Sequence, residues 1–162
     1  MKKNSKKKKY YLTICKNKNS YFNYFIKEKY ECGLSLKGWE IKSIRSRRTN
    51  IHNSYIFIRE GNAYIVGVSI RPLYNTSLSS ESYKDKRNIQ LLLHKKEINY
   101  LLGKISREGY SLIALSLILK KSWCKIIIGL AKGKKNIDKR ICEKNKEWII
   151  TKNRIFKNSF KN

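Results

Sequence analysis

WCKIIIGLAKGKKNIDKR, residues 123–140, is the stretch in which the chain changes from apolar to strongly basic. Residues 123–130 contain three consecutive isoleucines followed by a glycine, a composition typical of a buried β-strand. Residues 132–140 carry five cations and one aspartate, and Gly133 interrupts them. The stretch therefore predicts a folded body whose last strand leads directly into a flexible, basic exit.

The composition indicates a globular protein whose partner is a polyanion. Hydrophobic residues make up 41% of the 162 residues, which is enough for the core of a single domain. The formal net charge is +27. So large an excess repels itself in the folded state and favours a nucleic acid as partner. The alternative is a lysine-rich composition that reflects AT-rich coding DNA and gives only a solvated basic surface.

The cysteines predict neither a disulfide framework nor a metal site. Cys15, Cys32, Cys124 and Cys142 are dispersed, with no CxxC pair and no histidine at a ligand spacing. We expect four free thiols in a reducing compartment, no bound metal and no cofactor.

No targeting or membrane segment is predicted. The basic residues 2–9 are not followed by the apolar run of a signal peptide. No apolar segment reaches the roughly 20 residues that a helix needs to cross a bilayer. We therefore expect a cytoplasmic protein that does not bind a membrane.

The hydrophobic pattern predicts a mainly β fold. Since the last two strands are apolar on both faces, we expect a small antiparallel barrel of the oligonucleotide-binding (OB) type, with about six strands and two or three flanking helices. Residues 73–87 are expected to form a long loop. The expected helices are residues 36–48 and 94–107, the second ended by Gly109. The expected strands are residues 10–15, 21–30 (ended by Gly33), 54–59, 63–69, 110–119 and 123–131.

Charge divides the chain into three segments. Residues 1–9 hold six lysines and no acid, which predicts a disordered basic arm. Residues 10–131 form the expected RNA-binding barrel, and residues 132–162 the basic tail. We expect the tail to be disordered alone and to form an amphipathic helix on a partner. A helix folded onto the barrel and a helix on a membrane surface are the alternatives. The predicted apolar stripe of the tail consists of Trp148, Ile149, Ile155, Phe156 and Phe160.

No catalytic arrangement is recognisable in the sequence. His52 and His94 lie far from any nucleophile motif, and residues 129–135 lack the spacing of a phosphate-binding loop. Glu28, Glu31 and Glu40 are close in sequence, but surface carboxylates beside cations are the simpler explanation. The aromatic residues among lysines in residues 10–30 offer rings on which unpaired bases stack. We expect a binding protein, not an enzyme.

Short motifs follow one another in a fixed order, without large gaps, along residues 12–157. In chain order they are NK at 17–18, YFI at 24–26, ECGL at 31–34, LKGWEIKSIR at 36–45, NI at 50–51, SY at 54–55, LLLH at 91–94, REGY at 107–110, WCK at 123–125, AKGKK at 131–135 and DKR at 138–140. Together they resemble the SsrA-binding protein family (small protein B).

The resemblance implies an OB barrel that binds the tRNA-like domain of transfer-messenger RNA. It also implies delivery of that RNA to stalled ribosomes for trans-translation, with a tail that becomes ordered in the message channel and decoding centre. An elongation factor is an expected further partner through the shared RNA, and we expect a monomer. The alternative function is that of a basic structural ribosomal protein or a general RNA-binding protein. A third, an RNA-processing enzyme, would need turnover of RNA.

Two groups of site residues follow from the resemblance and from charge. The candidates for RNA binding are Asn17, Glu31, Lys42, Arg45, Arg87, Leu91, Lys125, Lys132, Lys134 and Lys135. The candidates on the tail for ribosome contact are Asp138, Lys139, Arg140, Trp148, Ile155 and Phe156.

The sequence departs from the family pattern at two places. Ser20, Phe22 and Asn23 stand where the family usually has alanine, histidine and an acid. Residues 88–90 (NIQ) replace a basic run, which leaves Arg87 as the main cation there. We expect phosphate to bind more weakly at that edge, an effect that Lys84 and Lys86 offset.

Overall fold

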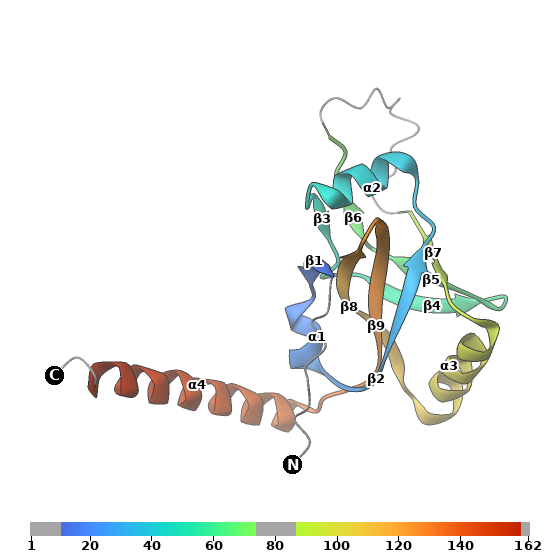
Figure 1. The fold of residues 1–162 in the computed structure, drawn as a ribbon. Coiled ribbons are helices and arrows are strands. Elements are labelled where there is room, and N and C mark those ends of the chain that lie inside the picture. The colour runs from blue at the N-terminus through green and yellow to red at the C-terminus, as the bar shows by residue number, and fades with distance from the viewer. Residues whose placement is uncertain (1–10, 74–86, 160–162) are drawn as a thin grey trace, which may run out of the picture.

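A ring of antiparallel strands forms the body of the protein in a computed structural model that describes residues 11–73 and 87–159 (Figure 1). The strands are β1 (Leu12–Lys16), β2 (Tyr24–Leu34), β3 (Thr49–Asn50), β4 (Tyr55–Arg59), β5 (Asn62–Val66), β6 (Ser69–Ile70), β7 (Ile89–Leu92), β8 (Ser111–Lys120) and β9 (Trp123–Gly133). The helices are α1 (Lys18–Asn23), α2 (Gly38–Arg45), α3 (Lys95–Glu108) and α4 (Asn136–Ser159).

Six of these strands close the barrel. Their order is β8-β4-β5-β7-β2-β9, and β9 pairs back onto β8, so the ring has no free edge among them. β1 lies outside the ring and pairs with β8, while β3 and β6 form a separate two-stranded sheet. Register shifts in β2 and β8 mark bulges, which bend long strands enough to close a small barrel. The predicted OB-type barrel of about six strands is confirmed.

The barrel core comes from alternate residues of β8 and β9. Ile126, Ile128 and Leu130 of β9 have no exposed surface, and each lies opposite a buried residue of β8. The other face of these strands is covered as well. At Gly129 the Leu115 side chain packs so closely that an added Cβ would lie 3.0 Å from it. Both faces are therefore buried, as the apolar runs predict.

The prediction of one strand over residues 21–30 is wrong in its first part. Residues 18–23 form the short helix α1, which begins at Asn17 because the Asn17 side chain accepts a hydrogen bond from the Ser20 backbone N–H at 3.3 Å. Gly33 does not end the strand either, since β2 continues to Leu34. A Cβ at Gly33 would lie 3.2 Å from Leu92, so glycine there lets β2 and β7 approach closely.

The other predicted helices and strands are found with shifted ends, except that the predicted strand over residues 63–69 is divided at Gly67 into β5 and β6. Strand β6 pairs with β3, which was not predicted. The hairpin of β4 and β5 turns at Glu60 and Gly61, and α3 ends at Gly109, whose φ of 66° is left-handed. Figure 1 shows α2 at one end of the barrel and α3 at the other. Strand β7 lies where no strand was predicted. The arm of residues 1–9, most of the predicted loop, Lys84, Lys86 and Phe160 fall outside the described residues.

The tail is a single helix, α4, of 24 residues. It leaves the barrel beside α1 and extends away from it (Figure 1). Trp148, Ile155 and Phe156 are exposed, so the apolar stripe does not pack on the barrel. The tail is helical in this structure, while its disorder in the free protein and its ordering on a partner stay predictions. No helix in residues 11–73 and 87–159 is long and apolar enough to cross a membrane.

Candidate nucleic-acid interface

The β8–β9 hairpin brings together three of the predicted RNA-binding residues. Glu31 of β2 accepts from the ammonium groups of Lys125, at 2.8 Å, and Lys120, at 3.2 Å. Arg45, at the end of α2, donates to the Ser122 carbonyl in the hairpin turn at 3.3 Å. The hydrogen bond from Lys125, followed by that from Lys120, lowers the pKa of Glu31, so this carboxylate is ionised at neutral pH. We call this group (Glu31, Arg45, Lys120, Lys121, Trp123 and Lys125) the hairpin patch.

Sequence reasoning missed three members of the hairpin patch, Lys120, Lys121 and Trp123. Trp123 is 75% exposed and lies directly opposite Lys120 at the tip of the hairpin. The signal that could have placed Trp123 at the tip is its position directly after KKS, the turn between two apolar runs. In the sequence alone this residue looks like the first residue of a buried strand.

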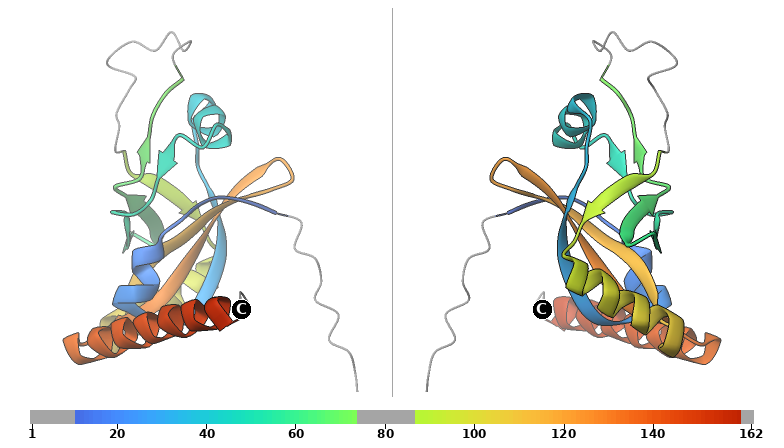
Figure 2. Two further views of the ribbon diagram at one scale, coloured as in Figure 1. Left: turned by 90° about the vertical axis from the view of Figure 1, so that its left-hand side faces the viewer. Right: turned by 90° about the vertical axis from the view of Figure 1, so that its right-hand side faces the viewer.

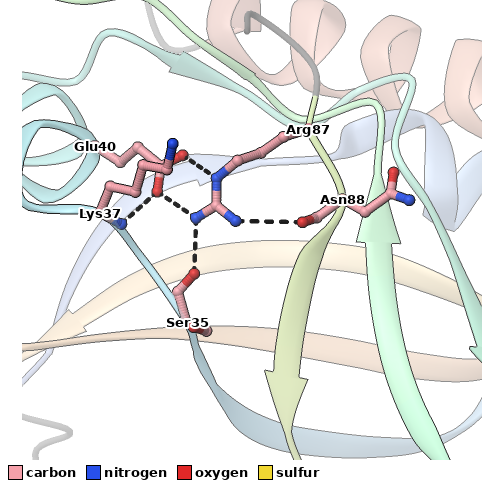
Figure 3. A network of polar contacts seen from close by, with 5 residues as sticks. All are labelled: Ser35, Lys37, Glu40, Arg87 and Asn88. Carbon is pink, nitrogen blue, oxygen red and sulfur yellow. Dashed lines mark hydrogen bonds and ion pairs between the residues drawn. The ribbon is translucent and has the colours of Figure 1, made fainter. Parts of the chain in front are cut away.

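Arg87 is engaged inside the protein rather than presented to a phosphate (Figure 3). Its guanidinium donates to both carboxylate oxygens of Glu40, at 2.6 and 2.7 Å, and to the Ser35 carbonyl at 2.8 Å. The Glu40 side chain is 2% exposed and also accepts from the Lys37 backbone N–H at 2.6 Å. Hydrogen bonding to Glu40 raises the pKa of Arg87. The pair joins α2 to the strand β7.

Two further predicted residues, Asn17 and Leu91, are buried. Asn17 is 4% exposed, caps α1 and donates to the His52 carbonyl at 3.3 Å. Leu91 is 2% exposed in β7, where it lies opposite Ala63 and Leu34 in the core. Their side chains contribute to the scaffold, and their part in RNA binding stays a prediction.

The other predicted cations divide into exposed and engaged groups. Lys42 lies exposed on α2, and Lys132 and Lys135 are exposed at the exit from the barrel. Lys134 is different: its backbone N–H donates to the Asn23 carbonyl at 2.9 Å and its ammonium to the Tyr21 carbonyl at 3.1 Å. These bonds satisfy carbonyls at the end of α1.

Lys134 also contacts the tail. Its ammonium lies 3.4 Å from the Cys142 sulfur on α4 and 4.9 Å from the centre of the Phe25 ring. One side chain thus touches α1, β2 and α4 at the point where the tail begins. We infer that Lys134 fixes the direction in which α4 leaves the barrel.

Lys134→Met is expected to impair the tail without weakening RNA binding. Methionine keeps the length of the side chain but loses the bonds that orient α4, and misplacement of a working group by about 1 Å can cost about 100-fold in activity. If the tail acts on the ribosome, as the family resemblance implies, ribosome-dependent activity should fall by about tenfold. Filter binding at several salt concentrations supplies the contrast: Lys135→Met should lower the slope of log affinity against log salt by about 1, and Lys134→Met should leave it unchanged. Equal slopes for both variants would contradict this assignment.

The predicted tail residues lie along α4. Asp138 stabilises the first turn of the helix, because its carboxylate accepts from the Lys135 backbone N–H at 3.1 Å. Lys139 is half-buried and Arg140 is exposed. Trp148, Ile155 and Phe156 are 64%, 63% and 54% exposed, so a stripe that would be core in a packed helix is open to a partner. The Lys152 ammonium lies over both aromatic rings, at 5.1 and 6.0 Å.

The carboxylates and thiols are arranged for structure. Glu28 accepts from the hydroxyls of Tyr30, at 2.5 Å, and Tyr100, at 3.0 Å, which ties α3 to β2. Burial raises the pKa of Cys32 to about 12, so this thiol stays protonated and unreactive. Within the described residues, no group of three or more histidine, cysteine or acidic side chains could hold a metal.

Comparison with known proteins shows a matching family model and similar solved structures. Residues 14–158 match the family model described as SmpB protein. A chain from the solved structure described as "tmRNA-SmpB: a journey to the center of the bacterial ribosome" is similar at 33% identity with a TM-score of 0.61. The match covers 75% of this chain and 85% of that chain.

Proposed function

Since this chain belongs to the SmpB protein family, we propose that it binds transfer-messenger RNA and delivers it to stalled ribosomes for trans-translation. The observation that carries the proposal is the family match over residues 14–158, which includes both the barrel and most of α4. The net charge of +27 supports an RNA partner. The chain acts as a binding factor in the cytoplasm, where ribosomes are, and catalyses no reaction itself.

We further propose a division of labour between the barrel and the tail. The barrel, with the hairpin patch and the exposed cations Lys42 and Lys132, holds the tRNA-like domain. The tail carries exposed apolar and cationic side chains on one long helix, which suits it to read a second surface, that of the ribosome. The chain works as a monomer and meets an elongation factor through the RNA that both hold.

The copurifying RNA tests the proposed function. Intact chain isolated from its own cells is expected to carry transfer-messenger RNA, identified by sequencing the bound RNA. Cosedimentation with empty, unstalled ribosomal subunits in the absence of any small RNA would instead indicate a structural ribosomal protein.

A salt titration measures the electrostatic share of binding. If the cations neutralise six or more phosphates, affinity for the tRNA-like domain should fall by about 1,000-fold or more as salt rises from about 50 to 200 mM. Fluorescence anisotropy of a labelled RNA gives the affinities. An affinity that does not change with salt would mean that the charge excess makes no contact with phosphate.

A further inference from the structure

Trp123 has no role in the packing of the barrel. It is the most exposed of the large hydrophobic residues in the described part of the chain, at 75%, and it stands at the tip of the β8–β9 hairpin. Figure 2 shows this hairpin projecting from the rest of the barrel. An indole held in water contributes no hydrophobic stabilisation, so folding does not explain its position.

The surroundings of Trp123 are cationic. Lys120 lies opposite it in the ladder, and Lys121 lies in the turn. Together with Arg45 and Lys125 these give four positive charges against the single carboxylate of Glu31, a net charge of +3 by 4 − 1. The contact of Arg45 with a backbone carbonyl leaves its charge uncompensated. An exposed ring within such a patch fits a polyanion that also offers a flat aromatic surface, which is RNA.

The tip of the hairpin is held in place from two sides. Arg45 ties the turn to α2, and Glu31 ties both strands of the hairpin to β2 through Lys120 and Lys125. Lys121 has a left-handed φ of 55°, a conformation that costs energy for a residue other than glycine. A ring presented on a braced turn loses little freedom when it binds, which favours affinity.

We propose that Trp123 is a stacking platform for one unpaired base of the RNA, while Lys121 and Arg45 contact the phosphates next to that base. This inference rests on the proposed function and adds to it a base contact made by Trp123, which is absent from the candidates that charge and the resemblance give. Stacking suits the site because every base has a π face, so the contact tolerates any sequence in an exposed loop of a folded RNA.

The test compares the affinities of three variants for the isolated tRNA-like domain. Trp123→Ala should weaken binding by about 5- to 150-fold, the range that stacking on one ring supplies. The slope of log affinity against log salt should stay unchanged, because an indole neutralises no phosphate, whereas Lys121→Met should lower that slope by about 1. Trp123→Phe should recover most of the affinity. Tyr55→Ala is the matched control, an aromatic residue that is 57% exposed and lies outside the hairpin patch.

Fluorescence gives a second readout that does not depend on a truncated side chain. In the Trp148→Phe chain, addition of the tRNA-like domain should quench the tryptophan emission. The further change Trp123→Phe should abolish this response. If Trp123→Ala fails to fold, the quenching of the tryptophan emission tests the inference in its place.

Three outcomes separate the hypotheses. Equal affinity of wild type and Trp123→Ala, with emission unaffected by RNA, would overturn the inference while leaving the proposed function intact. The same result with a loss of ribosome-dependent activity would assign Trp123 to a protein surface instead. Failure of the wild-type chain to bind the tRNA-like domain at all would overturn both proposals.

Discussion

A chain that ends at Arg140 is expected to bind the tRNA-like domain as tightly as the full chain does and to lose peptide tagging on stalled ribosomes. The barrel closes through β8 and β9 and reaches only to Gly133, so the deletion removes no residue of its core. The deleted residues include Trp148, Ile155 and Phe156, whose exposed side chains belong to the apolar stripe of α4. Binding is measured by anisotropy, and tagging by transfer of the peptide in a purified translation system with a message that lacks a stop codon.

The matched control keeps the charge of the tail and removes three apolar side chains of the stripe. A full-length chain with Trp148, Ile155 and Phe156 all changed to serine retains every cation of the tail. If the apolar stripe reads the ribosome, tagging should be lost in this variant as well, with no change in the salt dependence of RNA binding. Equal losses of RNA affinity and tagging in the truncated chain would contradict the division of labour.

Glu40→Gln is expected to destabilise the fold by about 3 kcal/mol. Removal of one partner of a buried ion pair leaves the other charge uncompensated, which typically costs about 3–5 kcal/mol. The lower end applies because the Arg87 side chain keeps 24% of its surface exposed, whereas that of Glu40 keeps 2%. A domain has a total stability of about 5–15 kcal/mol, so the loss is large. Urea unfolding followed by circular dichroism measures it.

The exposed pair of Arg59 and Glu60 provides the control. These side chains are 75% and 78% exposed at 3.1 Å, so Glu60→Gln should cost less than about 1 kcal/mol. Similar losses for Glu40→Gln and Glu60→Gln would show that the buried pair does not join α2 to β7. Arg87→Met should also destabilise the chain, yet leave the salt slope of RNA binding unchanged.

The elements that could be predicted from sequence are those whose pattern is local. The buried runs of β8 and β9, the Gly61 turn between β4 and β5, and the left-handed Gly109 after α3 each depend on a few neighbouring residues. Helix α1 was missed because its aromatic residues favour strands, and the capping by Asn17 that overrides them has a weak signal. Strand β7 has four residues, too few for a periodicity.

The site was harder to predict than the fold, because exposure and ion pairing depend on residues far apart in the chain. Arg87 and Glu40 are 47 residues apart, and nothing near Arg87 in the sequence reveals its partner. Leu91 and Asn17 fit the family motifs but lie in the interior. Conversely, Trp123 begins an apolar run and is nonetheless the most exposed indole in the described residues. Residue types indicated the partner, and only the fold shows which side chains can reach it.

The position of β1 outside the closed ring has a mechanical consequence. This strand is hydrogen-bonded to β8 alone, through the residues from Leu12 to Lys16, and the six other strands complete their ladders without it. Apart from the packing of Ile14 and Cys15 against the core, this one short ladder is what holds β1 to the barrel. β1 can therefore separate from β8 without opening the closed ring of six strands.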